Sequence, residues 1–126
     1  MRYLTLIILI TLATGCTSVE IQQARPITKG QIFVEEFTGA AGGIVTNVIE
    51  IEFQKKGLLT TQNEAKYILS GDSNFPGWTD GIAFELKDKS GNLYFRGNAT
   101  SGGFLLLREV SKDVAKEICK KFKKSH

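Results

Sequence analysis

Histidine is nearly absent from this chain of 126 residues, and the only one, His126, is the last residue. Because terminal residues usually fray, His126 is a poor candidate for a catalytic base or a metal ligand. A nucleophile activated by histidine and a histidine-based metal site are therefore not expected. The sequence predicts neither a catalytic residue nor a metal site or cofactor.

Paired carboxylates suited to acid–base catalysis are also lacking. Glu35 and Glu36 are neighbours on an expected strand, so their side chains point to opposite faces. Glu50 and Glu52 are two residues apart on an expected helix and do not share a face. We interpret all four as solvated surface residues and predict that the protein is not an enzyme.

Cysteine is scarce as well, with Cys16 and Cys119 as the only two. If Cys16 carries a lipid, Cys119 has no partner for a disulfide within the chain. Cys119 lies between Ile118 and Lys120 on the last expected helix. We interpret it as a small buried apolar residue, with a reactive thiol or an intermolecular bridge as the alternative.

Neither sign of charge is in large excess, since 16 basic and 13 acidic residues give a net charge of +3. Removal of residues 1–15 takes Arg2 away and leaves +2. Such a balance predicts neither a nucleic-acid partner nor a strongly acidic substrate.

The chain does contain one long apolar segment, at its beginning. Arg2 is followed by an apolar run from Tyr3 to Ala13, which is too short to span a membrane because spanning needs about 20 residues. Charge, apolar run and small residues in this order indicate a secretion signal. Residues 12–16, LATGC, resemble the lipobox of bacterial lipoproteins, with Ala13 where leucine is usual.

The lipobox resemblance implies that residues 1–15 are removed and that Cys16 carries diacylglycerol and an acyl chain such as palmitate. Thr17, rather than an aspartate retention signal, follows the cysteine. We therefore expect a protein anchored by lipid in the outer membrane and facing the periplasm. Residues 16–30 are predicted to be the lipidated cysteine and an irregular tether, which would reach at most about 50 Å. Residues 31–126 are predicted to form a single domain.

Hydrophobic periodicity predicts an α+β fold. Strands are expected at 31–37, 58–61, 65–71, 81–87 and 93–99, with helices over 44–56 and from residue 111 onward; 104–110 stays open between an edge strand and a buried turn. The order β-α-β-β-β-β-α predicts a mixed, largely antiparallel sheet of four to five strands. Both helices are expected on one face of it, through the stripes Ile44/Val48/Ile51 and Val114/Ile118/Phe122.

This succession carries a family resemblance. The segments IFVEEF, KKGLLTT, AKYILSG, FELKDKSGNLYF and VAKEICKKF follow one another at ordinary spacings. They resemble the α+β core of lipoproteins similar to the curli-secretion lipoprotein and the outer-membrane activators of penicillin-binding proteins, although Lys66 stands where that core often has aspartate. The resemblance implies a fold and no catalytic motif. The long alternating strand pairs of a pore are not present in the sequence.

Two loops remain as candidate binding sites. Phe75 and Trp78 lie in a loop around Pro76-Gly77 and could contact a partner, because tryptophan is enriched at interfaces; alternatively they plug the end of the core. The glycine-rich segment 39–43 lies between a strand and a helix, where phosphate binds in other folds, but it lacks the P-loop pattern.

We therefore predict a lipid-anchored, non-enzymatic module that binds or helps to assemble another envelope protein. The alternative is an exported enzyme or small-ligand carrier that uses a cleft near Gly39–Gly43.

Overall fold

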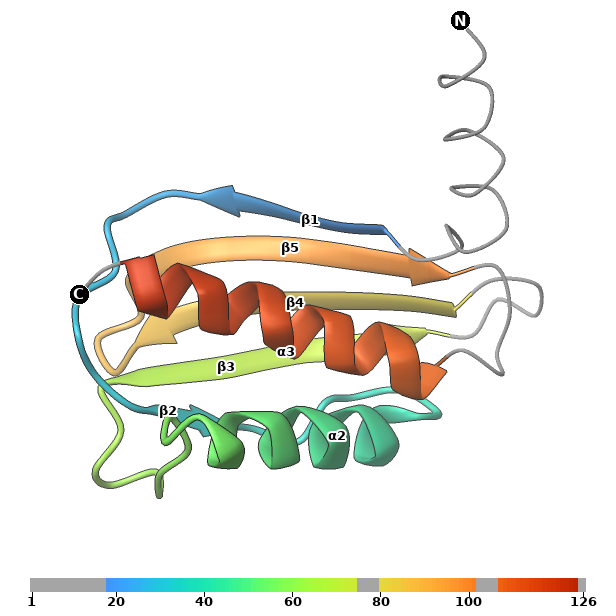
Figure 1. The fold of residues 1–126 in the computed structure, drawn as a ribbon, viewed down its shortest axis with the longest axis horizontal. Coiled ribbons are helices and arrows are strands. Elements are labelled where there is room, and N and C mark those ends of the chain that lie inside the picture. Colours follow the sequence, from blue (N-terminus) through green and yellow to red (C-terminus); the bar gives the residue numbers. More distant parts are fainter. Residues whose placement is uncertain (1–17, 75–79, 102–106, 125–126) are drawn as a thin grey trace, which may run out of the picture.

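The protein is described by a computed structural model in which residues 18–74, 80–101 and 107–124 are placed. These residues contain five strands and two helices in the order β1 Ser18–Gln23, β2 Ile32–Val34, α2 Gly42–Lys55, β3 Tyr67–Asn74, β4 Asp80–Asp88, β5 Leu93–Ser101 and α3 Leu107–Lys124. The strands form one sheet in the order β1-β5-β4-β3-β2. Both helices cover the same face of that sheet (Figure 1).

Three of the four strand pairs are antiparallel, and only β2 and β3 are parallel. The predicted α+β fold, with a mixed and largely antiparallel sheet and two helices on one face, is confirmed. No helix within residues 18–74, 80–101 and 107–124 is both long and apolar enough to cross a membrane.

The strands expected at 81–87 and 93–99 form as β4 and β5, which pair antiparallel as a hairpin. Ile82, Phe84 and Leu86 are buried on the helix face of β4. In the turn, the Asp88 carboxylate accepts hydrogen bonds from the backbone N–H groups of Ser90 and Asn92 at 2.9 and 3.0 Å. The side-chain amide of Asn92 also donates to this carboxylate at 3.0 Å, and this bond, followed by the backbone bonds, lowers the pKa of Asp88 because it favours the charged form.

Two strand glycines make room for aromatic rings under the helices. A side chain at Gly71 would start 2.5 Å from a ring carbon of Phe37, and one at Gly97 would start 2.5 Å from a ring carbon of Phe84. These rings therefore lie directly on the sheet backbone, which only glycine permits at such distances.

The predicted tether is wrong, because residues 18–30 belong to the fold. Residues 18–23 form β1, which pairs antiparallel with β5 along its whole length. Ile27 is buried, and the Tyr67 hydroxyl donates to the carbonyl of Thr28 at 3.0 Å and accepts from its N–H at 3.0 Å. A strand at the edge of a sheet can be formed by mostly polar residues. The polar run SVEIQQ therefore did not indicate a strand from the sequence.

Two predicted elements also differ. Residues 58–61 contribute only an isolated bridge between Ile32 and Leu59 rather than a strand. Residues 107–110, for which an edge strand or a buried turn was expected, are the first turn of α3, so the helix begins four residues earlier than residue 111 and Ser111 lies inside it. Its hydroxyl donates to the Leu107 carbonyl at 2.8 Å.

The buried stripe of α3 is the predicted one, whereas that of α2 is not. Val114, Ile118 and Phe122 are at most 1% exposed. In α2, Ile44 and Ile51 are 44% and 45% exposed. The sheet is instead covered by Val45, Ile49 and Phe53, which are fully buried.

Candidate functional site

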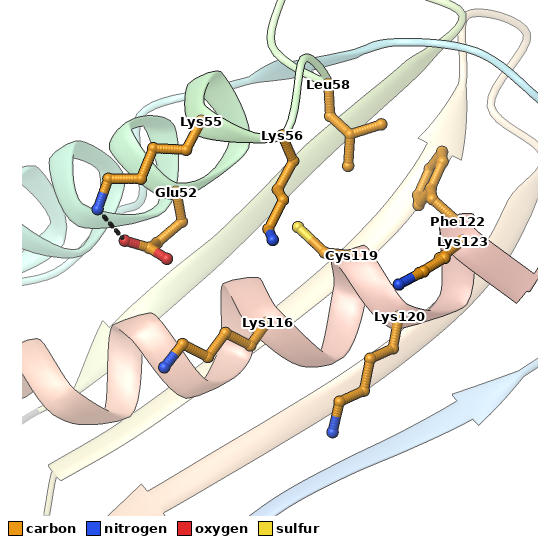
Figure 2. A pocket seen from close by; sticks show the side chains of 9 residues that line it. All are labelled: Glu52, Lys55, Lys56, Leu58, Lys116, Cys119, Lys120, Phe122 and Lys123. Atoms are coloured by element: carbon orange, nitrogen blue, oxygen red, sulfur yellow. Dashed lines mark hydrogen bonds and ion pairs between the residues drawn. The ribbon is translucent and has the colours of Figure 1, made fainter.

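A groove of about 600 Å³ lies between the C-terminal halves of the two helices. Figure 2 shows the side chains around it, which come from the end of α2, the turn after it and the second half of α3. The lining residues are Glu52, Lys55, Lys56, Leu58, Lys116, Cys119, Lys120, Phe122 and Lys123. Five lysines and one glutamate thus surround three uncharged residues.

The end of α2 brings one side of the groove into place. Gly57 takes a φ of +71°, a left-handed conformation that suits glycine and stops the helix. The N–H of Leu58 donates back to the Phe53 carbonyl at 2.9 Å, and its own carbonyl accepts from Ile32 of β2 at 2.7 Å. The turn therefore sets Lys56 at the rim and holds Leu58 beside the sheet.

Helix α3 supplies the other side through simple periodicity. Lys116, Lys120 and Lys123 are spaced i, i+4 and i+7, which places them along one flank of the helix. Phe122 packs edge-on against Tyr67 of β3, with ring centroids 5.3 Å apart. That contact fixes the end of α3 on the sheet and with it the position of the lysines.

The floor of the groove is apolar. Phe122 is buried, and Leu58 and Cys119 are half-buried and packed against the core. Burial raises the pKa of the Cys119 thiol; the nearby ammonium of Lys56 opposes this and Glu52 adds to it. Because an ordinary thiol pKa already lies above neutral pH, Cys119 is a neutral thiol there and adds no charge to the floor.

The rim carries more positive charge than its neighbours neutralise. The ammonium of Lys55 lies 3.2 Å from the Glu52 carboxylate, and that of Lys120 lies 2.9 Å from Glu117. Within the described part of the chain, Lys56, Lys116 and Lys123 make no ion pair. In Figure 2 Lys56 and Cys119 project toward one another, whereas Lys120 projects away from the groove.

This arrangement suits binding. Lysines lay their aliphatic stems along apolar surface and keep their ammonium groups in water, so one groove can hold an apolar group beside an anion. No three His, Cys, Asp or Glu side chains in the described ranges come together closely enough to hold a metal ion.

The residues predicted as sites lie elsewhere. Cys16, Phe75 and Trp78 are outside the described residues, so lipidation at Cys16 and partner binding at the other two stay predictions. Cys119 was predicted to be a buried apolar residue, but it is only half-buried and its thiol faces the groove.

The glycine-rich segment 39–43 has a structural explanation. Gly39 has a φ of +96°, and a side chain there would start 1.8 Å from the Ser73 carbonyl oxygen. A side chain at Gly42 would start 1.8 Å from the carbonyl oxygen of Phe37. Both glycines are therefore required by close packing of backbone on backbone.

Sequence reasoning did not identify the groove. Lysines near the C-terminal end of a helix such as α3 are common in any case, because the helix dipole favours cations at that end. The available signal was the spacing of Lys116, Lys120 and Lys123 together with the two lysines that precede Gly57. Nothing in the sequence indicated that the ends of the two helices would meet.

No protein-family profile matches the chain, and no curated protein sequence matches it. Solved structures that share the fold include two bacterial proteins. TolB from Acinetobacter baumannii superposes with a TM-score of 0.57 and 13% identity, over 83% of this chain and 31% of TolB. Protein XCC0632 from Xanthomonas campestris, of family DUF330, superposes with a TM-score of 0.53 and 10% identity, over 75% of this chain and 84% of its own. This chain thus spans about a third of TolB, and at such identities the likeness extends to the fold alone.

Proposed function

We propose that this chain is a lipid-anchored protein of the bacterial cell envelope that binds another envelope protein and catalyses no reaction. The signal and lipobox-like residues 1–16 support the anchor. The fold shared with two bacterial proteins is consistent with a bacterial origin.

The lysine-rimmed groove is the observation that carries the binding role. Its apolar floor and its lysines Lys56, Lys116 and Lys123, which pair with no carboxylate among the described residues, complement a segment in which acidic side chains flank an apolar one. Electrostatic complementarity of this kind speeds encounter and selects partners, while the apolar contact slows dissociation. The partner is therefore an envelope protein with an exposed acidic and apolar segment.

Charge reversal in the groove tests this proposal. Lys123 and Lys89 are both exposed lysines, but Lys89 lies in the β4–β5 turn and does not line the groove. In pull-downs from crosslinked cells, Lys123→Glu should lose the partner that the wild type captures, and Lys89→Glu should retain it. Equal capture by both variants would contradict the groove as the binding site.

The same groove supports a second candidate, a small-ligand carrier. Its volume of about 600 Å³ falls within the range of small-molecule sites, about 300–1,000 Å³, and its floor is apolar. An anionic amphiphile would place its acid group among the lysines. Protection of Cys119 from alkylation by a fatty acid, without any protein captured in the pull-down, would favour this carrier role.

A further inference from the structure

The strand that follows the predicted lipid anchor is firmly built into the sheet. All six residues of β1 pair with β5, from Ser18 opposite Thr100 to Gln23 opposite Phe95. Val19 and Ile21 pack against the core, and a side chain at Gly97 would start 2.4 Å from the Glu20 carbonyl oxygen. β1 is therefore part of the domain and does not act as a spacer.

Only one residue, Thr17, separates this strand from Cys16. Consecutive Cα atoms are about 3.8 Å apart, so Cys16 lies within about 8 Å of Ser18. Opposed residues of antiparallel strands are about 5 Å apart, which places Thr100 within about 13 Å of the same cysteine. The tether expected from the sequence would have allowed about 50 Å.

One end of the sheet is consequently next to the anchor. We call it the anchor end, and it is formed by Ser18 of β1, Ser101 of β5, Asp80 of β4 and Asn74 of β3, which the strand registers place side by side. Helix α3 also begins at this end (Figure 1). Each headgroup layer of a bilayer is roughly 5–8 Å thick, comparable to the reach from Cys16 to Ser18.

The groove lies toward the opposite end. Phe122 contacts Tyr67, the first residue of β3, whereas Asn74 at the anchor end is the last. Seven steps of about 3.3 Å separate these two residues, or roughly 23 Å. From Leu107 to Lys123 the helix rises by about 24 Å, at about 1.5 Å per residue.

We infer that the folded domain stands directly on the membrane on its anchor end, without a tether, and holds its lysine-rimmed groove at the end away from that bilayer. The inference rests on the lipid anchor of the proposed function. It places the backbone of the anchor end at the level of the lipid headgroups. It also means that the groove lysines serve a partner reached from the aqueous side rather than the lipids of the protein's own membrane.

Lipid-depth quenching tests this arrangement with the full lipidated protein. In a Cys119→Ser background, single cysteines replace Thr100 near the anchor end and Lys89 in the β4–β5 turn at the other end, both of which are exposed. Each is labelled with an environment-sensitive fluorophore in vesicles of phosphatidylcholine and phosphatidylglycerol. Lipids with headgroup-level nitroxides should quench the label at position 100 strongly and that at position 89 weakly.

A linker insertion supplies the matched control. A Gly-Ser linker of about twenty residues between Thr17 and Ser18 would span roughly 25 Å on average and should abolish most of the quenching at position 100. Equal quenching at the two positions would mean that the domain lies on its side. Quenching at position 100 that the linker leaves unchanged would show that contact does not depend on the short connection. Either result overturns the inference.

Intact mass separates this inference from the proposed function. A mature chain that begins at Cys16 and carries acyl groups, yet shows no quenching at position 100, overturns the standing arrangement alone. A chain without acyl groups overturns the lipid anchor, and the membrane-standing arrangement with it.

Discussion

The two helices cover the same face of the sheet but differ in how clearly their sequences reveal the buried side. Helix α3 has a strongly polar composition interrupted by one apolar stripe, and that stripe is buried. Helix α2 has apolar residues around most of its circumference and leaves Ile44 and Ile51 about half exposed. A helix shows its buried face only when the remaining faces are polar.

The face that α2 buries is explained by its surroundings. Thr46 turns inward, where its hydroxyl accepts from the Phe37 N–H at 2.8 Å and donates to the Gly42 carbonyl at 2.8 Å. These bonds fix the rotation of the first turn relative to the incoming chain. The same rotation buries Phe53, the largest apolar side chain of the helix. Phe53 therefore indicated the buried side of α2 better than Ile44 or Ile51 did.

Among substitutions that test the difference between the two helices, we expect the largest loss of stability in α3. Ile118 is fully buried at the centre of its stripe, so Ile118→Ala should destabilise the protein by about 2–5 kcal/mol through lost burial and the cavity left behind. Chemical denaturation measures the change. A loss below about 0.5 kcal/mol would mean that α3 is not docked on the sheet.

An intermediate effect is expected from the contact that orients α2. Thr46→Val keeps the side-chain shape but leaves the buried Phe37 N–H without its acceptor, which should cost about 1–3 kcal/mol. Denaturation of Thr46→Ser gives the control, because serine restores the hydroxyl. If valine and serine at this position have equal stability, the hydrogen bond does not set the rotation of α2.

The smallest effect is expected from the exposed side of α2. Ile51→Ala should change the free energy of unfolding by no more than about 0.5 kcal/mol, because the side chain is 45% exposed. The fully buried Ile49 is the matched comparison, and Ile49→Ala should cost about 2–5 kcal/mol. A large loss at residue 51 and a small one at 49 would show that α2 is rotated in solution.

Much of the fold could be predicted because the informative segments have clean periodicity. Tyr67 and Leu69 of β3, the alternation of β4 and the stripe of α3 each identify a buried face from local sequence. Prediction failed where a residue's environment depends on segments that are far away in the sequence. The polar β1 is a strand only because β5 offers it an edge, and residues 107–110 are helical although FLLLREV also resembles a strand.

The candidate site likewise has parts that local sequence shows and parts that depend on distant segments. The lysines and Cys119 are visible in the sequence, but their common groove is not, because its two sides lie about 60 residues apart in the chain. Cys16 was a local prediction, and it remains one. The reach of the predicted anchor, in contrast, changed from a long tether to a single residue once β1 was found in the sheet.

The sequence by itself determined the α+β class, the hairpin turn at Asp88, the end of α2 at Gly57 and the buried stripe of α3. Each of these depends on backbone preferences or periodicity within a few neighbouring residues. Only the tertiary structure decided which side of α2 is buried, that residues 18–23 close the sheet, and that lysines from two helices surround one apolar floor. These features depend on which surfaces meet after the chain has folded, and no local pattern records that choice.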